Sequence, residues 1–235
     1  MLLKIFIQTV LLDKIQNPNM FDIGFLETPE NQANWKFLVK TLSSLVKPNS
    51  LIWVLGKLTS FEYEVLRSDY VSVDIVGEPN FKIDLEKERL SSFEDNSFNT
   101  VICTEVLEHL NNLHNVFDDI CRVSNKYIII SLPNNWLHFK YMLIKNKGAT
   151  KFYGLLVEKP IDRHKWFFNY DQALNFLRKR GEINNFTYKF HIPIPFVPFG
   201  FKYHLMNLFF RYYYKNQFGS NNASYSYVWV LLQKV

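Results

Sequence analysis

The sequence predicts an α/β domain with a mostly parallel sheet, and two observations support this prediction. Four short apolar runs, at 51–55, 70–76, 100–104 and 127–131, have the length and composition of strands. Their apolar character is continuous rather than alternating, which indicates strands buried on both faces. Segments with helical spacing lie between these runs. This alternation is typical of a doubly wound sheet with right-handed crossovers.

Three helices are expected from the spacing of apolar residues. The first covers 28–46 and the second covers 113–124, each with apolar side chains on one helical face. The third is expected to begin after Asn169, with Gln172 at the capping-box position and Gly181 at its end. These helices provide the layers that a parallel sheet requires.

The last third of the chain is expected to complete a single domain over 1–235. The runs 186–192 and 226–234 are predicted strands that close the sheet. Residues 1–48 are expected to form an N-terminal helical region, and the aromatic-rich stretch 193–222 is interpreted as an insertion or lid. A length of 235 residues allows one sizeable core but not two full domains.

Composition excludes several classes of protein. The net charge of +5 fits an anionic ligand or surface, but it is too small to indicate nucleic acid. Cys103 and Cys121 are widely spaced, so neither a disulfide framework nor a metal site is expected. The apolar start of the chain is interrupted by polar and charged residues and predicts no signal peptide, and no run is long enough to span a membrane. A cytoplasmic location is therefore expected.

An acidic residue ends the second predicted strand. Asp74 follows Gly56 by eighteen residues, close to the roughly 20-residue spacing of the carboxylate that binds ribose hydroxyls in dinucleotide-type folds. A carboxylate suits this task because it accepts two hydrogen bonds from neighbouring hydroxyls. The alternative is an exposed acid at a strand end, which is common.

The centre of the chain contains several motifs in a fixed order. Residues 74–112 include the pair Asp84-Leu85, the turn "FEDNSFN" and the run "EVLEHL" that starts at Glu105. The pattern continues through "CRVSNKYIIISLPN" and "DRHKWFFNYDQA". Together these motifs resemble class I S-adenosylmethionine-dependent methyltransferases of the type 11 group, in a subgroup associated with cell-surface glycans. The resemblance covers roughly 35–190.

The resemblance implies a Rossmann-like methyltransferase fold with a seven-stranded, mostly parallel sheet, an antiparallel last strand and helices on both faces. It implies S-adenosyl-L-methionine as the cofactor and methyl transfer to a small-molecule or glycan/lipid-linked acceptor, in polysaccharide biosynthesis. The implied cofactor-binding residues are Gly56, Asp74, Asp84, Leu85, Thr104 and Glu105. Asp74 would bind the ribose and Asp84-Leu85 the adenine, while Thr104 and Glu105 would lie beneath the methionine part.

The glycine-rich loop of this family is degenerate here. The family pattern Asp/Glu-x-Gly-x-Gly has Val54 at the acidic position, Gly56 at the first glycine and Leu58 at the second. The side chains of Lys57 and Leu58 are expected to narrow the cofactor pocket, because only glycine lets the backbone of this loop approach the cofactor closely. The alternative function is therefore a catalytically inactive binding or scaffold module in a glycan-assembly complex.

Candidates for the acceptor side come from two further motifs. Asp162 and His164 are candidate general bases, with His109 as a third, and Arg163 and Trp166 are candidate acceptor-binding residues. His109 is expected one helical turn after Glu105, so that both side chains face the pocket. The structural alternatives are a histidine that orients the strand–helix junction and a salt-bridged turn at 162–166.

The stretch 193–222 has two interpretations. Its many aromatic residues, interspersed with Lys202, Arg211 and Lys215, suit contact with an anionic membrane surface. The alternative is an aromatic lid over the acceptor site. The oligomeric state is not indicated by the sequence.

Overall fold

The computed structural model describes the chain except for residues 1–51, 56–69, 76–78, 145–151, 161 and 196–200. The predicted helix over 28–46 and the N-terminal helical region lie outside the described residues, as does Gly56 with the rest of the degenerate loop. The remaining segments contain all the other predicted elements.

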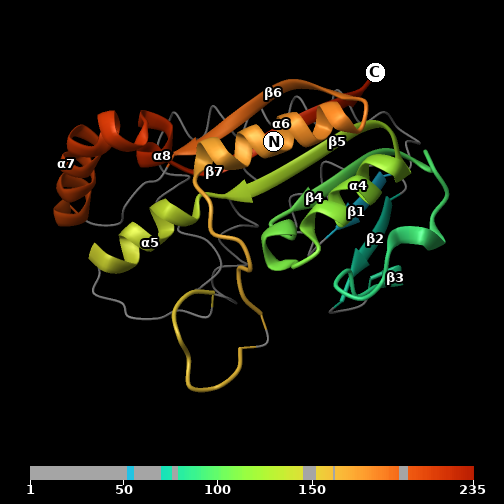
Figure 1. Ribbon diagram of the computed structural model, residues 1–235, viewed down its shortest axis with the longest axis horizontal. Helices are drawn as coiled ribbons and strands as arrows, with labels where there is room; N and C mark the ends of the chain where they lie inside the picture. The colour runs from blue at the N-terminus through green and yellow to red at the C-terminus, as the bar shows by residue number, and fades with distance from the viewer. Residues whose placement is uncertain (1–51, 56–69, 76–78, 145–151, 161, 196–200) are drawn as a thin grey trace, which may run out of the picture.

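The described residues form one sheet of order β3-β2-β1-β4-β5-β7-β6 (Figure 1). Its strands are β1 (Ile52–Leu55), β2 (Tyr70–Asp74), β3 (Phe81–Lys82), β4 (Phe98–Thr104), β5 (Ser124–Pro133), β6 (Phe186–Pro195) and β7 (Tyr225–Lys234). β1 to β5 pair in parallel, whereas β7 runs antiparallel to both of its neighbours. The predicted α/β class and the parallel pairing of the four apolar runs are confirmed.

Helices connect and flank these strands. They are η2 (Leu90–Ser92), η3 (Leu107–His109), α4 (Leu113–Val123), α5 (Asn135–Ile144), α6 (Tyr170–Ile183), α7 (Phe201–Phe218) and α8 (Ser220–Ser224). α4 and α6 lie on the same face of the sheet (Figure 1), where the rings of Phe117 and Phe176 meet edge to face at 5.4 Å. The aromatic-rich stretch 193–222 contains the end of β6, the helix α7 and the start of α8. Helices on both faces stay a prediction, since the expected first helix is not described.

Both faces of the sheet are buried at its centre. Val101, Ile102 and Cys103 are consecutive residues of β4 and expose between 0% and 4% of their surface. Because successive side chains of a strand point to opposite faces, this burial requires cover on each side. The continuous apolar run was therefore a correct sign of a doubly covered strand.

Helix α6 begins as predicted but ends later. The Asn169 side chain accepts a hydrogen bond from the Gln172 N–H, and the Gln172 side chain accepts one from the Asn169 N–H, which completes the capping box. The prediction that Gly181 ends the helix is wrong, because α6 continues to Ile183 and its C-cap is Asn184. Gly181 is instead buried against β7, where a Cβ would lie 3.1 Å from Leu232 Cδ1.

Gly181→Ala is expected to lower the free energy of unfolding by about 1 kcal/mol. Alanine favours a helix over glycine by about 1 kcal/mol, but crowding a packed core costs about 1–3 kcal/mol. Leu232 is fully buried and has little room to yield. Urea unfolding of the two proteins measures the difference. A more stable alanine variant would show that helix propensity outweighs the contact with Leu232.

Candidate functional site

The strand order creates a switch point between β1 and β4. From β1 the chain proceeds to β2 and β3 on one side, and β4 with β5 extends to the other side. Ligands of such sheets bind in the crevice outside the carboxyl ends of the strands at this point. Asp74 ends β2 and Thr104 ends β4, so two of the predicted cofactor-binding residues lie at this edge.

Glu105 lies just beyond β4 in an unusual backbone conformation. Its φ is 53°, in the left-handed region that residues other than glycine seldom adopt. Its N–H donates to the Ser131 carbonyl of β5 at 3.4 Å, and its side chain is exposed at the sheet edge. Backbone strain of this kind is concentrated at functional sites, where surrounding contacts hold it in place.

The predicted adenine-binding pair lies in a turn after β3. The Asp84 carboxylate accepts from the Glu86 N–H at 3.1 Å and pairs with Lys87 Nζ at 2.7 Å. The hydrogen bond from Lys87 is the main reason that the pKa of Asp84 lies below its usual value. The Leu85 carbonyl accepts from Asn112 Nδ2 at 2.7 Å. Among the described residues, the Leu85 N–H donates no hydrogen bond.

The three candidate bases lie together although the sequence separates them widely. His109 Nδ1 lies 2.6 Å from Asp162 Oδ1. The rings of His109 and His164 meet edge to face, with centroids 4.7 Å apart. The expectation that His109 shares a helical face with Glu105 is wrong. Glu105 has a left-handed backbone conformation, and η3 begins only at Leu107.

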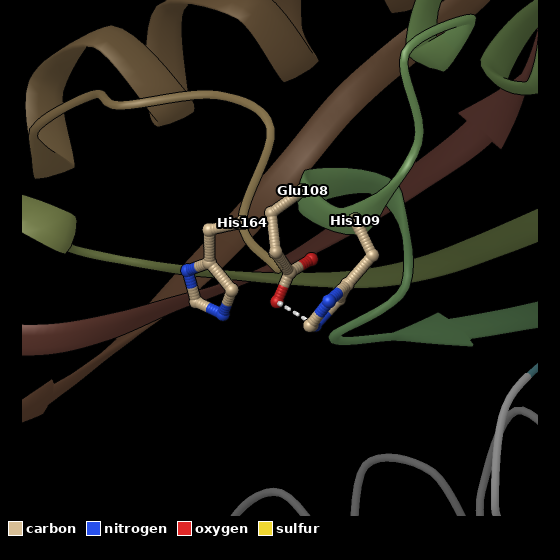
Figure 2. Close-up of side chains that lie close together, drawn as sticks. All are labelled: Glu108, His109 and His164. Carbon is tan, nitrogen blue, oxygen red and sulfur yellow. Dashed lines mark ion pairs between the residues drawn. The ribbon is translucent and has the colours of Figure 1, made fainter. Parts of the chain in front are cut away.

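His164 is positioned by the elements around it. Its Nδ1 lies 2.8 Å from Asn135 Nδ2, at the start of α5, and 2.9 Å from the Tyr153 hydroxyl. Its ring also packs against that of Phe152, with a centroid separation of 4.7 Å. Because these contacts occupy Nδ1, the Nε2 edge of the His164 ring points toward His109 and the neighbouring Glu108 (Figure 2).

Glu108 is a site residue that the sequence prediction missed. Its side chain is buried, with 1% exposed, yet Oε2 has no hydrogen-bond partner. Oε1 lies 3.7 Å from His109 Nε2, and Figure 2 shows the carboxylate between the two imidazole rings. Burial, and then the charge of Glu105, raise the pKa of Glu108 well above its usual value. The available signal was the second carboxylate of "EVLEHL", directly before the histidine.

Arg163 and Trp166, the predicted acceptor-binding residues, form hydrogen bonds that stabilise the loop in which they lie. Arg163 Nη2 donates to the Gly154 carbonyl at 2.8 Å, and Trp166 Nε1 donates to the Leu110 carbonyl at 2.7 Å. The Lys165 N–H donates to the Glu108 carbonyl at 2.8 Å. The bonds of Lys165 and Trp166 hold residues 162–169 against η3. Roles of Arg163 and Trp166 in acceptor binding stay predictions.

Comparisons with known proteins agree with this architecture. Residues 63–128, less than half of the chain, match the family described as "Methyltransferase domain". A SAM-dependent methyltransferase from Methanosarcina mazei is similar in structure, with a TM-score of 0.50, 13% identity and coverage of 83% of this chain and 97% of that one. The YcgJ protein of Bacillus subtilis gives a TM-score of 0.51 at 10% identity, with 86% and 98% covered. No curated protein matches the chain.

These similarities define the class of fold. At such low identity the solved structures establish a Rossmann-like methyltransferase fold, which the resemblance in sequence implied. The family match over 63–128 also supports S-adenosylmethionine as the cofactor. Within the described segments, every helix is too short or too polar to cross a membrane.

Proposed function

We propose that the chain transfers a methyl group from S-adenosylmethionine to a hydroxyl of a small-molecule or glycan/lipid-linked acceptor, in the cytoplasm and in cell-surface polysaccharide biosynthesis. The observation that carries the proposal is the arrangement at the carboxyl edge of the sheet. Asp74, the Asp84-Leu85 turn and Glu105 surround the switch point of a methyltransferase-like sheet. The cluster of His109, Asp162 and His164 is built on the loops at the same edge.

The described residues fit the cofactor. Asp74 offers a carboxylate at the end of β2 for the ribose hydroxyls, and its Oδ1 already accepts from the Ile75 N–H at 2.6 Å. The Leu85 N–H, which donates no hydrogen bond among the described residues, would donate to a ring nitrogen of adenine. Asp84 can turn from the exposed Lys87 to the adenine amino group, because that ion pair is worth little in solvent.

The chemistry divides between cofactor and protein. S-adenosylmethionine supplies a methyl group already activated by a sulfonium. The residues of this chain must therefore position the acceptor hydroxyl in line, exclude water and remove one proton. The group formed by His109, Asp162 and His164 offers imidazole and carboxylate acceptors for that proton.

An apolar groove supports a lipid-linked acceptor. It has a volume of about 340 Å³, and its walls come from α5, the loop before α6, α7 and α8: Trp136, Leu137, Phe139, Lys140, Leu143, Phe167, Phe210, Asn222 and Ala223. The Phe167 ring contacts that of Tyr153, which contacts His164 in turn. An apolar chain in the groove would therefore end beside the catalytic cluster. In this proposal α7, within 193–222, acts as a lid that also meets the membrane surface.

A scaffold protein without cofactor is the second candidate. The observation that favours it is the sequence of the loop after β1, which has Val54 in place of an acid and Leu58 in place of a glycine. Such a protein would keep the fold and the groove but would not bind S-adenosylmethionine.

Calorimetry with S-adenosylhomocysteine distinguishes the two candidates. We expect one site per chain with a dissociation constant on the order of 1–100 µM, about −8 to −5 kcal/mol. ATP, which shares the adenine and ribose but lacks the amino-acid part, is the control and should bind far more weakly. No heat at millimolar S-adenosylhomocysteine would favour the scaffold.

A further inference from the structure

The side chains of Glu108, His109 and His164 converge on one small space (Figure 2). Each offers one ligand atom, and these atoms all lie within 4.8 Å of one another. We propose that the three residues bind a divalent transition-metal ion, for which Zn²⁺ is the best probe.

The ligand set suits such an ion. Two imidazoles and one carboxylate are a common set for Zn²⁺ and Fe²⁺, and they leave positions open for water or substrate. Ligands at about 2.1 Å from a tetrahedral ion are roughly 3.4 Å apart. The Glu108–His109 pair, at 3.7 Å, is already close to this spacing, and the other pairs lie within 4.8 Å, a gap that small rotations of the side chains close. Mg²⁺ prefers oxygen ligands and should bind weakly.

The unpaired oxygen of Glu108 is an independent observation that indicates a cation. Oε2 is buried and accepts no hydrogen bond. A buried carboxylate without a partner is costly, and this one also feels the charge of Glu105. The nearest imidazole does not satisfy Oε2, because His109 Nε2 approaches the other carboxylate oxygen, Oε1, and only to 3.7 Å. A metal ion would satisfy the carboxylate directly.

Outer partners fix the rings of both histidines, and the partner of His109 is typical of a metal ligand. A metal-binding imidazole usually donates its other N–H to a carboxylate or another oxygen, which fixes the ring. Asp162 provides that acceptor for Nδ1 of His109. Around His164, Asn135 Nδ2 at 2.8 Å and the Tyr153 hydroxyl at 2.9 Å both contact Nδ1 and fix the orientation of the ring. Both rings then direct Nε2 into the space beside Glu108 (Figure 2).

The metal would take part in the reaction of the proposed function, and this role rests on that proposal. A divalent cation that holds the acceptor hydroxyl lowers its pKa. The proton then passes to the half-exposed carboxylate of Asp162, the oxygen forms a bond to the methyl carbon, and the C–S bond breaks with its electrons left on sulfur. His109 and His164 act in this scheme as ligands, and neither is needed as the base.

The test is a Zn²⁺ titration of the full chain without a histidine tag, after removal of metals by a chelator. A chromophoric competitor reports the affinity, and we expect one Zn²⁺ per chain. Glu108→Gln and His164→Phe should each weaken binding at least about 100-fold, and Asp162→Asn about 10–100-fold through the orientation of His109. His114→Gln, a change in an exposed histidine on α4, is the matched control and should bind as the original does.

Two further readouts separate a metal site from a structural cluster. Co²⁺ in place of Zn²⁺ should give visible absorption bands that disappear in His164→Phe. Without metal, Glu108→Gln should unfold at the same temperature as the original protein or higher, because it replaces a buried carboxyl whose Oε2 accepts no hydrogen bond. Absence of one-to-one Zn²⁺ binding, or binding that survives in both Glu108→Gln and His164→Phe, would overturn the proposal. S-adenosylhomocysteine calorimetry on the same protein shows separately whether the methyltransferase proposal fails.

Discussion

Asp119→Ala is expected to lower the free energy of unfolding by about 2–4 kcal/mol. The Asp119 side chain exposes 4% of its surface and accepts hydrogen bonds from Arg89, Arg122 and the Leu90 N–H. These bonds join α4 to the η2 turn that follows the Asp84-Leu85 segment. Removing one partner of a buried pair costs about 3–5 kcal/mol, and the exposure of Arg89 reduces the loss here.

The neighbouring acid provides a matched control. Asp118 lies next to Asp119 on α4, pairs with Arg180 at 2.5 Å and exposes 31% of its side chain. Asp118→Ala should cost only about 1 kcal/mol, because an ion pair near solvent contributes little. Urea unfolding of both variants gives the comparison. If both variants lose the same free energy of unfolding, then burial does not make the contacts of Asp119 stronger than those of Asp118.

The loss caused by Asp119→Ala should also depend on pH. Burial raises the pKa of Asp119, but the hydrogen bonds from Arg89 and Arg122 outweigh burial, so its pKa lies below the usual value. A carboxyl with a lowered folded-state pKa contributes stability above its unfolded pKa of about 3.9, and this stability is lost as pH falls through the folded value. The difference between original and variant should therefore shrink below about pH 4.

Asp74→Ala is expected to weaken the binding of S-adenosylhomocysteine by about 1–3 kcal/mol, or roughly 5–150-fold. The change removes the acceptor for two ribose hydroxyls and leaves them unpaired. Asp74→Asn should weaken binding less, because the amide keeps one acceptor oxygen. Calorimetry of the three proteins provides the measurement.

The control for Asp74 is an acidic residue at the amino ends of the strands, on the side of the sheet away from the proposed cofactor site. Asp95 precedes β4 at its amino end and pairs with Arg122, with 69% of its side chain exposed. Asp95→Ala should leave the affinity for S-adenosylhomocysteine unchanged. If Asp74→Ala binds as tightly as Asp95→Ala, then Asp74 does not hold the ribose.

The sheet could be predicted from the sequence because local signals determine most of it. Continuous apolar runs marked β1, β2, β4 and β5, whose carboxyl ends place Asp74 and Thr104 at one edge. The capping box at Asn169 was likewise a local pattern. The end of α6 could not be predicted from a local pattern, because the close packing of Gly181 against Leu232 depends on a distant strand.

The candidate site could be predicted only in part. The motifs "EVLEHL" and "DRHKWFF" identified His109, Asp162 and His164. The missed residue, Glu108, acquires its role from tertiary structure. Its burial depends on the loop that carries Lys165, and its oxygen faces a histidine far along the chain. The left-handed backbone of Glu105 is also a tertiary effect, since a glutamate gives no local sign of positive φ.

The most direct test of the proposed function is a crystal structure of the chain grown with millimolar S-adenosylhomocysteine. We expect the ligand across the carboxyl edge of the sheet, with its ribose hydroxyls on the Asp74 carboxylate and its adenine against the Leu85 N–H. A structure without the ligand, with the side chain of Lys57 or Leu58 in the position of the methionine part, would contradict it.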